Sequence, residues 1–561
     1  MGFRRTIVTL LILCAAASVP ASSGTATSLS AGDLRKSGTV HLDFACKPEL
    51  EQDFQVAVAL LHSFFYEEAR LRFEDIARRD PSCAMAWWGA AMTWYHPLWT
   101  PPAPEDMTRG IAAVEQAKAL GGSNELEQGL IDAIDAYFRS EDAPVDPQQP
   151  VAMSCHGPRA HGARANAFRL SLEELQRKFP GNLEVTVFYA LSLMGSADPT
   201  DKAYTRHLAA AALLEPLFER NPDHPGIPHY IIHAYDFPPL AARGIVAARQ
   251  YDDIAPWVPH ALHMPTHIYT RLGMWDECIQ GNLASAAASR DYAARVHGGA
   301  TYYEELHASD YLVFAYLQTA QDKKAGELVQ RLGTVQQIVP GSDLVAAYAL
   351  GAIPARYALE RRQWKDAVEL QVVRPDFVGR FPFALAHVEF ARAVGAARAG
   401  DVESALRAVD RLRSLRETMT EPKFQWWTGQ IEIQRLAAEG WLRQAQGKSD
   451  EALGLLRQSA ELEERSGTHP VTPGQILPAR EQLGDLLMML ARPSEALVEY
   501  ELSLAVFPNR FNSHYGAARA AESAGKPELT RKHYKQLVAM AGAGDGRRKE
   551  LGQARDFLAK P

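Results

Sequence analysis

The feature that most constrains the fold is a sequence period of 34 residues. Two His-x-x-x-His pairs recur at this offset, His229 and His233 in one copy and His263 and His267 in the next. Such a period is typical of solenoids in which helical hairpins stack on one another. Residues i and i+4 share a helix face, and equivalent helices of stacked hairpins lie side by side. We therefore expect four imidazoles to project from two neighbouring helices towards one surface.

The same period organises the C-terminal part of the chain. With Leu477 as repeat position 1, Gly484 and Ala496 fall at positions 8 and 20, Tyr500 at 24 and Pro508 at 32. This is the tetratricopeptide pattern, in which small residues lie where two helices touch and a proline ends the second helix. Alternating β-branched runs are nearly absent. The sequence therefore predicts an all-α fold, an α-solenoid of tetratricopeptide-like helical hairpins.

The N-terminus has the features of a secretory signal peptide. Arg4 and Arg5 precede a short apolar core at 7–19 and small residues at 21–23. That core is too short for a transmembrane helix, and we find no other stretch long enough to span a bilayer. We expect an exported protein, periplasmic or secreted, with five segments: signal peptide 1–23, N-terminal hairpins 44–140, a Pro- and Gly-rich loop insertion 141–163, central histidine-rich repeats 164–330 and C-terminal repeats 331–561.

Charge and cysteine content narrow the function classes. The net charge is −8, and it becomes −10 without Arg4 and Arg5, which argues against nucleic acid as a partner. Disulfides can form outside the cytoplasm. Cys46 and Cys83 are the best candidates for a bridge, but spacing cannot decide whether they pair. Cys278 falls where the repeat needs a small packed residue, so we expect a buried thiol.

Residues 44–93 and 165–320 resemble a family of exported bacterial tetratricopeptide-repeat proteins. The stretches that carry the resemblance are EEARLRFEDIARRDPSCAMAWWGAAM, HPGIPHYIIHAYD, PHALHMPTHIYTRLG and HASDYLVFAYLQ. The resemblance implies a right-handed α-solenoid whose first helices line a concave groove. It implies no particular reaction.

Repeat counting places a polar cluster on that groove. Repeats that start at Pro225, Pro259 and Leu306 put polar residues at positions 2, 5, 9 and 12, which form one stripe of a helix. In tetratricopeptide repeats this stripe faces the ligand, an orientation that the resemblance implies. The stripe carries His229, His233, Asp236, His260, His263, His267, His307 and Asp310.

The cluster contains the residue types of a transition-metal site. Our first choice of ligands is His229, His233, His263 and His267, with His260, His307, Asp236 and Asp310 as additional ligands or as partners that orient the ring N–H groups. All-imidazole ligation suits a divalent Zn, Cu, Fe or Ni ion. The glutamate of the HExxH zinc-protease motif is missing from both pairs, which disfavours that class. A hydrogen-bonded structural or peptide-binding cluster is the alternative.

Two functions stay open at this stage. The first is a scaffold that binds a peptide, a protein segment or a small ligand in its concave groove, with a histidine metal site in the central repeats. The second is a metal-dependent enzyme, an oxidoreductase or hydrolase, that uses the histidine cluster as its active site. The metal content of the purified protein discriminates between a metal site and a purely structural cluster.

Export makes a direct prediction about the mature N-terminus. Cleavage after the small residues should remove about 21–23 residues, so N-terminal sequencing of protein from its native host should begin near Ser22 to Gly24. The same protein expressed without residues 2–23 serves as the control for a non-exported chain. An intact Met1 on protein recovered from the cytoplasm would contradict export.

Overall fold

The computed structural model describes residues 36–98, 101–140, 160–198, 201–339, 342–421, 425–467, 469, 471–542, 544–545 and 548–560. The signal peptide 1–23 and nearly all of the loop insertion 141–163 lie outside these residues. Within them the chain is helical, and the only β-type pairing is an isolated bridge between Thr301 and Ile338. In the described part of the chain, no helix has both the length and the apolar character needed to cross a bilayer.

The helices follow one another as hairpins. The N-terminal segment contains η1 (Pro48–Leu50), α2 (Glu51–His62), α3 (Tyr66–Arg79), α4 (Ala84–Met92), α5 (Pro104–Leu120) and α6 (Glu125–Arg139). The central segment contains α7 (Ala160–Lys178), α8 (Leu183–Gly195), α9 (Thr205–Phe218), α10 (Gly226–Tyr235), η2 (Ala241–Gly244), α11 (Ile245–Ile254), α12 (Pro259–His263), α13 (Pro265–Leu272), α14 (Trp275–Val296), α15 (Tyr303–Gln318) and α16 (Asp322–Leu332).

The C-terminal segment continues in the same way. It contains α17 (Asp343–Glu360), α18 (Trp364–Val368), α19 (Pro375–Val378), α20 (Pro382–Ala399), α21 (Val402–Thr418), α22 (Gln425–Ala445), α23 (Ser449–Ser466), α24 (Ala479–Met489), α25 (Pro493–Val506), α26 (Phe511–Ser523), α27 (Pro527–Met540) and α28 (Lys549–Leu558). Successive helices pack against each other along nearly the whole chain. The prediction of an all-α solenoid of tetratricopeptide-like hairpins is confirmed.

Small residues explain why the hairpins stack closely. The ring of Tyr500 in α25 lies so near Gly516 in α26 that an added Cβ would come within 2.3 Å of it. Phe73 in α3 makes the same contact with Gly89 in α4, again within 2.3 Å of an added Cβ. Both glycines follow their aromatic partner by 16 residues, so one packing rule operates at both ends of the chain.

The disulfide and the buried thiol are as the sequence suggested. Cys46, just before η1, is bonded to Cys83 at the start of α4, with 5.0 Å between their Cα atoms. The bridge joins the segment that precedes the first hairpin to the turn that follows it. Cys278 in α14 is free and buried.

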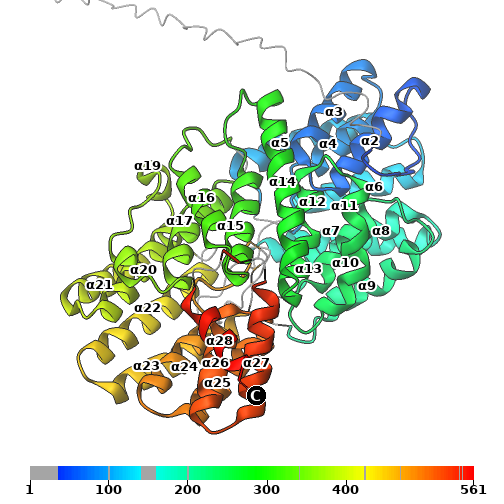
Figure 1. Ribbon diagram of the computed structural model, residues 1–561. Coiled ribbons are helices and arrows are strands. Elements are labelled where there is room, and N and C mark those ends of the chain that lie inside the picture. The colour runs from blue at the N-terminus through cyan, green and yellow to red at the C-terminus, as the bar shows by residue number, and fades with distance from the viewer. Residues whose placement is uncertain are drawn as a thin grey trace, which may run out of the picture.

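The C-terminal repeats fold back onto the central ones. Figure 1 shows α26 and α28 directly below α15, and α15 contacts α26. Trp275 Nε1 donates to the carbonyl of Asn509 at 2.9 Å, and the amide of Phe511 donates to Gln318 Oε1 at 2.9 Å. The solenoid therefore closes on itself, and His263, His267 and His307 of the inner stripe are buried instead of facing an open groove.

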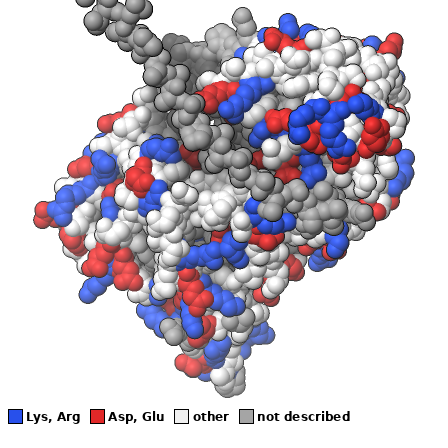
Figure 2. All heavy atoms as spheres, turned by 90° about the horizontal axis from the view of Figure 1, so that it is seen from above, with Lys and Arg blue, Asp and Glu red and all other residues white. Residues whose placement is uncertain are grey.

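A buried ion cluster supports this closure. Arg510, fully buried, donates to Glu481 Oε2 at 3.0 Å and to Glu360 Oε1 at 2.6 Å. Burial alone would lower the pKa of Arg510, but the charges of Glu360 and Glu481 outweigh it and raise the pKa, so the guanidinium stays charged. The charges on the surface, unlike this buried cluster, are exposed to solvent. Figure 2 shows Lys and Arg interleaved with Asp and Glu over the face drawn. Many of these exposed pairs lie one helical turn apart, as Arg407 and Glu403 do.

Removing the buried cation should destabilise the protein strongly. Arg510→Leu leaves two carboxylates buried without their partner, and we expect a loss of about 3–5 kcal/mol in the free energy of unfolding, measured by urea denaturation. Arg407→Leu removes an exposed arginine from an i,i+4 pair and should leave that free energy nearly unchanged. Equal, small effects for the two variants would contradict a role of Arg510 in closure.

Candidate metal centre

The histidine stripe lies on four consecutive inner helices. His229 and His233 belong to α10, His260 and His263 to α12, His267 to α13 and His307 to α15. Pro265 begins α13 directly after Met264, which interrupts the helix between the two histidines of the second pair. The i,i+4 relation survives this interruption, because the Nε2 atoms of His263 and His267 are 3.0 Å apart.

The histidines form two groups of three. In each group every residue offers one nitrogen, and these nitrogens lie within 4.8 Å of one another. The first histidine group consists of His229, His233 and His260, and the second histidine group of His263, His267 and His307. His233 is half-buried and the other five are buried.

This arrangement differs from the single four-histidine site expected from the sequence. The pairs His229/His233 and His263/His267 are each brought together, but in separate groups. His260 and His307, expected as additional ligands, each complete one group. The reason is geometric: position 2 of one repeat lies beside positions 5 and 9 of the preceding repeat.

The two predicted aspartates have different surroundings. Asp236 accepts from His267 Nδ1 at 2.8 Å and from Arg271 Nε at 3.0 Å, so it orients a ring as predicted for such a carboxylate. Burial would raise the pKa of Asp236, but Arg271 and His267 outweigh it and lower the pKa. Asp310 instead forms an ion pair with Arg356, with 3.2 Å between Oδ1 and Nε.

The protons of the second histidine group can be assigned from its hydrogen bonds. His267 Nδ1 faces the Asp236 carboxylate, which can only accept, so Nδ1 carries the proton. His263 Nδ1 lies 2.7 Å from Asn282 Oδ1. The amide nitrogen of Asn282 donates to the carbonyl of Cys278, so its oxygen accepts the proton of His263. Both Nε2 atoms therefore present lone pairs to each other at 3.0 Å.

Two facing lone pairs repel each other, and a cation between or beside them would relieve this repulsion. A shared proton would make one ring an imidazolium. Burial opposes this, because it holds the pKa of His263 well below its usual value, and His307, His267 and His260 lower it further. Burial lowers the pKa of His307 in the same way, followed by the charges of His267, His260 and His469. A tetrahedral zinc ion with bonds of about 2.0–2.1 Å separates its nitrogen ligands by about 3.3 Å. The Nε2 atoms of His263 and His267 are close to this separation, at 3.0 Å.

A third cluster uses similar residues with a different result. His62 Nε2 lies 2.9 Å from Glu184 Oε2, and His224 Nε2 lies 3.0 Å from Glu184 Oε1. Gly226 N–H donates to His224 Nδ1, and the hydroxyl of Tyr230 lies 2.9 Å from His62 Nδ1. Each ring thus donates one proton to the carboxylate and accepts one elsewhere. Hydrogen bonds satisfy this cluster completely, which is the signature of a structural network.

Sequence reasoning missed the residues that support the groups. The carbonyl of His62 accepts from His229 Nδ1 at 2.6 Å, Glu304 Oε1 lies 3.3 Å from His260 Nδ1, and Asn282 orients His263. Glu304 stands three residues before His307, so its position in sequence was a usable signal. His62 contacts the stripe from the distant helix α2, and periodicity does not reveal this contact.

A cavity of about 400 Å³ lies between residues of the central and of the C-terminal repeats. Its lining includes Phe237, which follows Asp236 in the chain, together with Trp426, Phe507 and His469. Glu463 also lines it, and burial raises the pKa of this carboxyl to about 8, so it is largely protonated at neutral pH. The lining is mainly apolar and also carries Asp198, Asp201, Lys202, Glu464 and Arg480. An apolar cavity with a few polar groups is typical of a small-molecule site.

Comparisons with known proteins give no family. No family model matches the sequence, and no curated protein matches it. Solved structures with distant similarity include a tetratricopeptide repeat protein from Parabacteroides merdae ATCC 43184 (11% identity, 51% of this chain, 98% of that chain, TM-score 0.30). Yeast Tom70 is similar at the same level, with 11% identity over 86% of this chain and 91% of that chain and a TM-score of 0.33. So is a human IFIT1 dimer with m7Gppp-AAAA, with 12% identity over 82% of this chain and 90% of that chain and a TM-score of 0.36.

Proposed function

We propose that this chain is an exported helical-repeat protein that holds a divalent transition-metal ion at His263, His267 and His307. The single observation that carries the proposal is the contact between the Nε2 atoms of His263 and His267 at 3.0 Å, with both Nδ1 protons committed elsewhere. His307 supplies the third nitrogen of the same group. Neutral imidazoles favour Zn, Cu, Ni or Fe over the hard cations Mg and Ca.

The proposed ligand is a small molecule in the adjoining cavity. Three protein ligands leave a coordination position that a further donor can occupy, as in sites that bind substrate or water. The histidine stripe is buried, which argues against a peptide laid along it. Two residues link the cavity to the metal group: Phe237 follows Asp236 in the chain, and the charge of His469 helps to lower the pKa of His307. Trp426 and Phe507 would contact apolar parts of the ligand, and the Glu463 carboxyl would donate a hydrogen bond.

Metal analysis of three proteins tests the proposal. Wild-type protein purified without chelators should contain a transition metal, or take up Co²⁺ with a visible absorption band. His267→Ala should weaken binding by at least about 10–100-fold, because losing even an indirect partner of a ligand costs that much. His387→Gln is the matched control: it replaces another buried histidine, one that pairs with Gln434, and should keep the metal.

The proposal fails if wild-type protein neither contains nor takes up metal. It also fails if His267→Ala and His387→Gln lose metal equally, since the loss would then reflect the fold. Far-UV circular dichroism and urea denaturation of each variant separate these cases from simple unfolding.

The pH dependence of metal affinity follows from burial. Metal competes with protons for the ring nitrogens, and the pKa values of His263 and His307 lie well below 6.5. Protons should therefore compete little at pH 6.5, and Co²⁺ affinity should change little from pH 8 to 6.5 and fall only at lower pH. Isothermal titration at several pH values measures it.

An exposed histidine pair on the same chain provides the reference. In the double variant Glu403→His and Arg407→His, two histidines stand one turn apart on α21 in place of an exposed ion pair. Their affinity for Co²⁺ should fall as pH drops through about 6.5, the ordinary histidine pKa. Parallel pH profiles for the two sites would contradict Co²⁺ binding by the buried histidines. The double variant keeps the buried site, so its Co²⁺ titration should show a pH-insensitive and a pH-sensitive phase. Adding His263→Ala to it should abolish only the pH-insensitive phase.

A further inference from the structure

The two histidine groups are copies of one arrangement. Each takes positions 5 and 9 of one repeat and position 2 of the next, so His229 corresponds to His263, His233 to His267, and His260 to His307. His229 and His263 are 34 residues apart in the sequence, and so are His233 and His267. A helical repeat places equivalent positions in equivalent surroundings. A ligand set that suits a metal in one repeat therefore recurs in the other.

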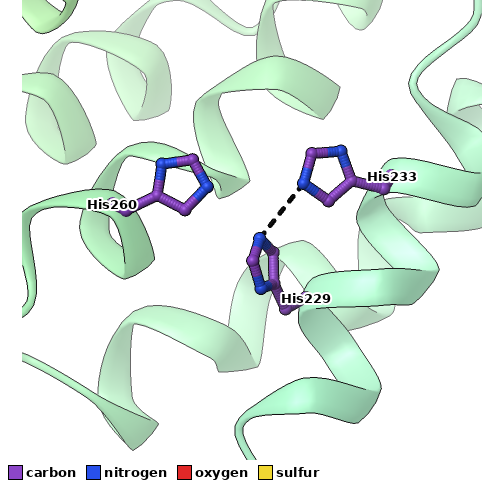
Figure 3. Close-up of side chains that lie close together, drawn as sticks. All are labelled: His229, His233 and His260. Carbon is purple, nitrogen blue, oxygen red and sulfur yellow. Dashed lines mark hydrogen bonds between the residues drawn. The ribbon is translucent and has the colours of Figure 1, made fainter. Parts of the chain in front are cut away.

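The first histidine group has a similar geometry, with one of its ring protons committed outside the group (Figure 3). His229 Nδ1 donates to the His62 carbonyl at 2.6 Å, so its Nε2 carries a lone pair. That Nε2 faces His233 Nε2 at 3.1 Å, and Figure 3 shows His260 approaching the same space from α12. A carboxylate faces one ring of each group, at different positions: Glu304 Oε1 lies 3.3 Å from Nδ1 of His260, and Asp236 accepts from Nδ1 of His267.

The two groups are neighbours through α12. His260 and His263 stand three residues apart on this helix, and their ring centroids are 6.5 Å apart. One ring belongs to each group. Two ions bound by the groups would therefore lie near the same face of α12, about one helical turn apart.

A bulky side chain closes the first group. Phe64 follows α2 with φ of +54°, in a turn where some hairpins have glycine, such as Gly273 and Gly400, and others a residue such as Ala320. A non-glycine residue in this conformation costs roughly 1 kcal/mol or more. Its ring packs against His229 at 4.4 Å and His260 at 5.7 Å between centroids. The ring thus covers the group, and glycine could not.

We infer that the first histidine group is a second transition-metal site, so that the protein holds two neighbouring ions, each on three histidines. The inference rests on the proposed function for the second group. Imidazole binds metal in its neutral form, so six such ligands contribute no charge. Among the described residues, Asp236 and Glu304 face rings of the two groups, and Asp236 is itself paired with Arg271. The pair of ions keeps most of its positive charge, so the ligand that completes their coordination should be a small anion, such as hydroxide or a carboxylate.

Metal stoichiometry of matched variants tests the inference. Wild-type protein loaded with Cu²⁺ and freed of excess metal should hold two ions per chain. His233→Ala and His267→Ala remove equivalent positions, and each should hold one. Electron paramagnetic resonance should show dipolar broadening in wild type and a narrow, isolated Cu²⁺ signal in both variants. The double variant should hold none.

The outcomes separate the two proposals. No metal in wild type overturns the proposed function itself. One ion in wild type, lost in His267→Ala and kept in His233→Ala, leaves the proposed function standing and overturns the second site. Loss of both ions in either single variant, with the fold retained, overturns two separate sites in favour of one shared centre. His233 is half-buried, which favours folding of its variant; His260→Gln provides a second removal from the same group.

Discussion

The carboxylate of Asp236 joins the histidine stripe to the closure of the solenoid. One oxygen accepts the Nδ1 proton of His267 and the other accepts from Arg271, whose Nη1 reaches the carbonyl of Pro473 at 3.3 Å. Arg356 makes equivalent contacts: it forms an ion pair with Asp310 and donates to the carbonyl of Gln475 at 2.7 Å. Two buried aspartate–arginine pairs thus hold the segment before α24 against the central repeats. The loss of either pair would leave a buried charge uncompensated, which is costly.

Closure determines the chemistry of the histidines. An open concave groove would leave the stripe in water, where imidazoles are half protonated near pH 6.5. Burial keeps His229, His263 and His307 neutral, because it lowers the pKa of each well below that value. His62 and Phe64 cover His229, and the segment before α24 reaches Arg271 beside the second histidine group. Neutral imidazole is the form that binds metal. The fold-back of the C-terminal repeats therefore supports both the stability of the molecule and the ligand state of its centre.

Helix type and phase could be predicted from the sequence because both are local properties. The 34-residue period placed six histidines on one inner stripe, and the structure has them there. The division into two groups could not be predicted, since it depends on distances between neighbouring helices. His307 lies 47 residues after His260 because α14 extends over 22 residues, yet it returns beside His263 with 4.3 Å between ring centroids. The hydrogen bond from His229 to the His62 carbonyl joins residues 167 apart, which no periodicity reveals.

Residue type alone does not distinguish a metal centre from a structural cluster; the count of protons does. In the cluster of His62, Glu184 and His224, one carboxylate receives two ring protons and every ring nitrogen has a partner of the opposite kind. In the second histidine group, acceptors outside the group take the Nδ1 protons of His263 and His267, and their Nε2 lone pairs then face each other. A buried lone pair gains nothing from another lone pair. The arrangement becomes favourable once a metal ion accepts both, so the hydrogen bonds around the rings are as much a part of the proposed centre as the nitrogens that point into it.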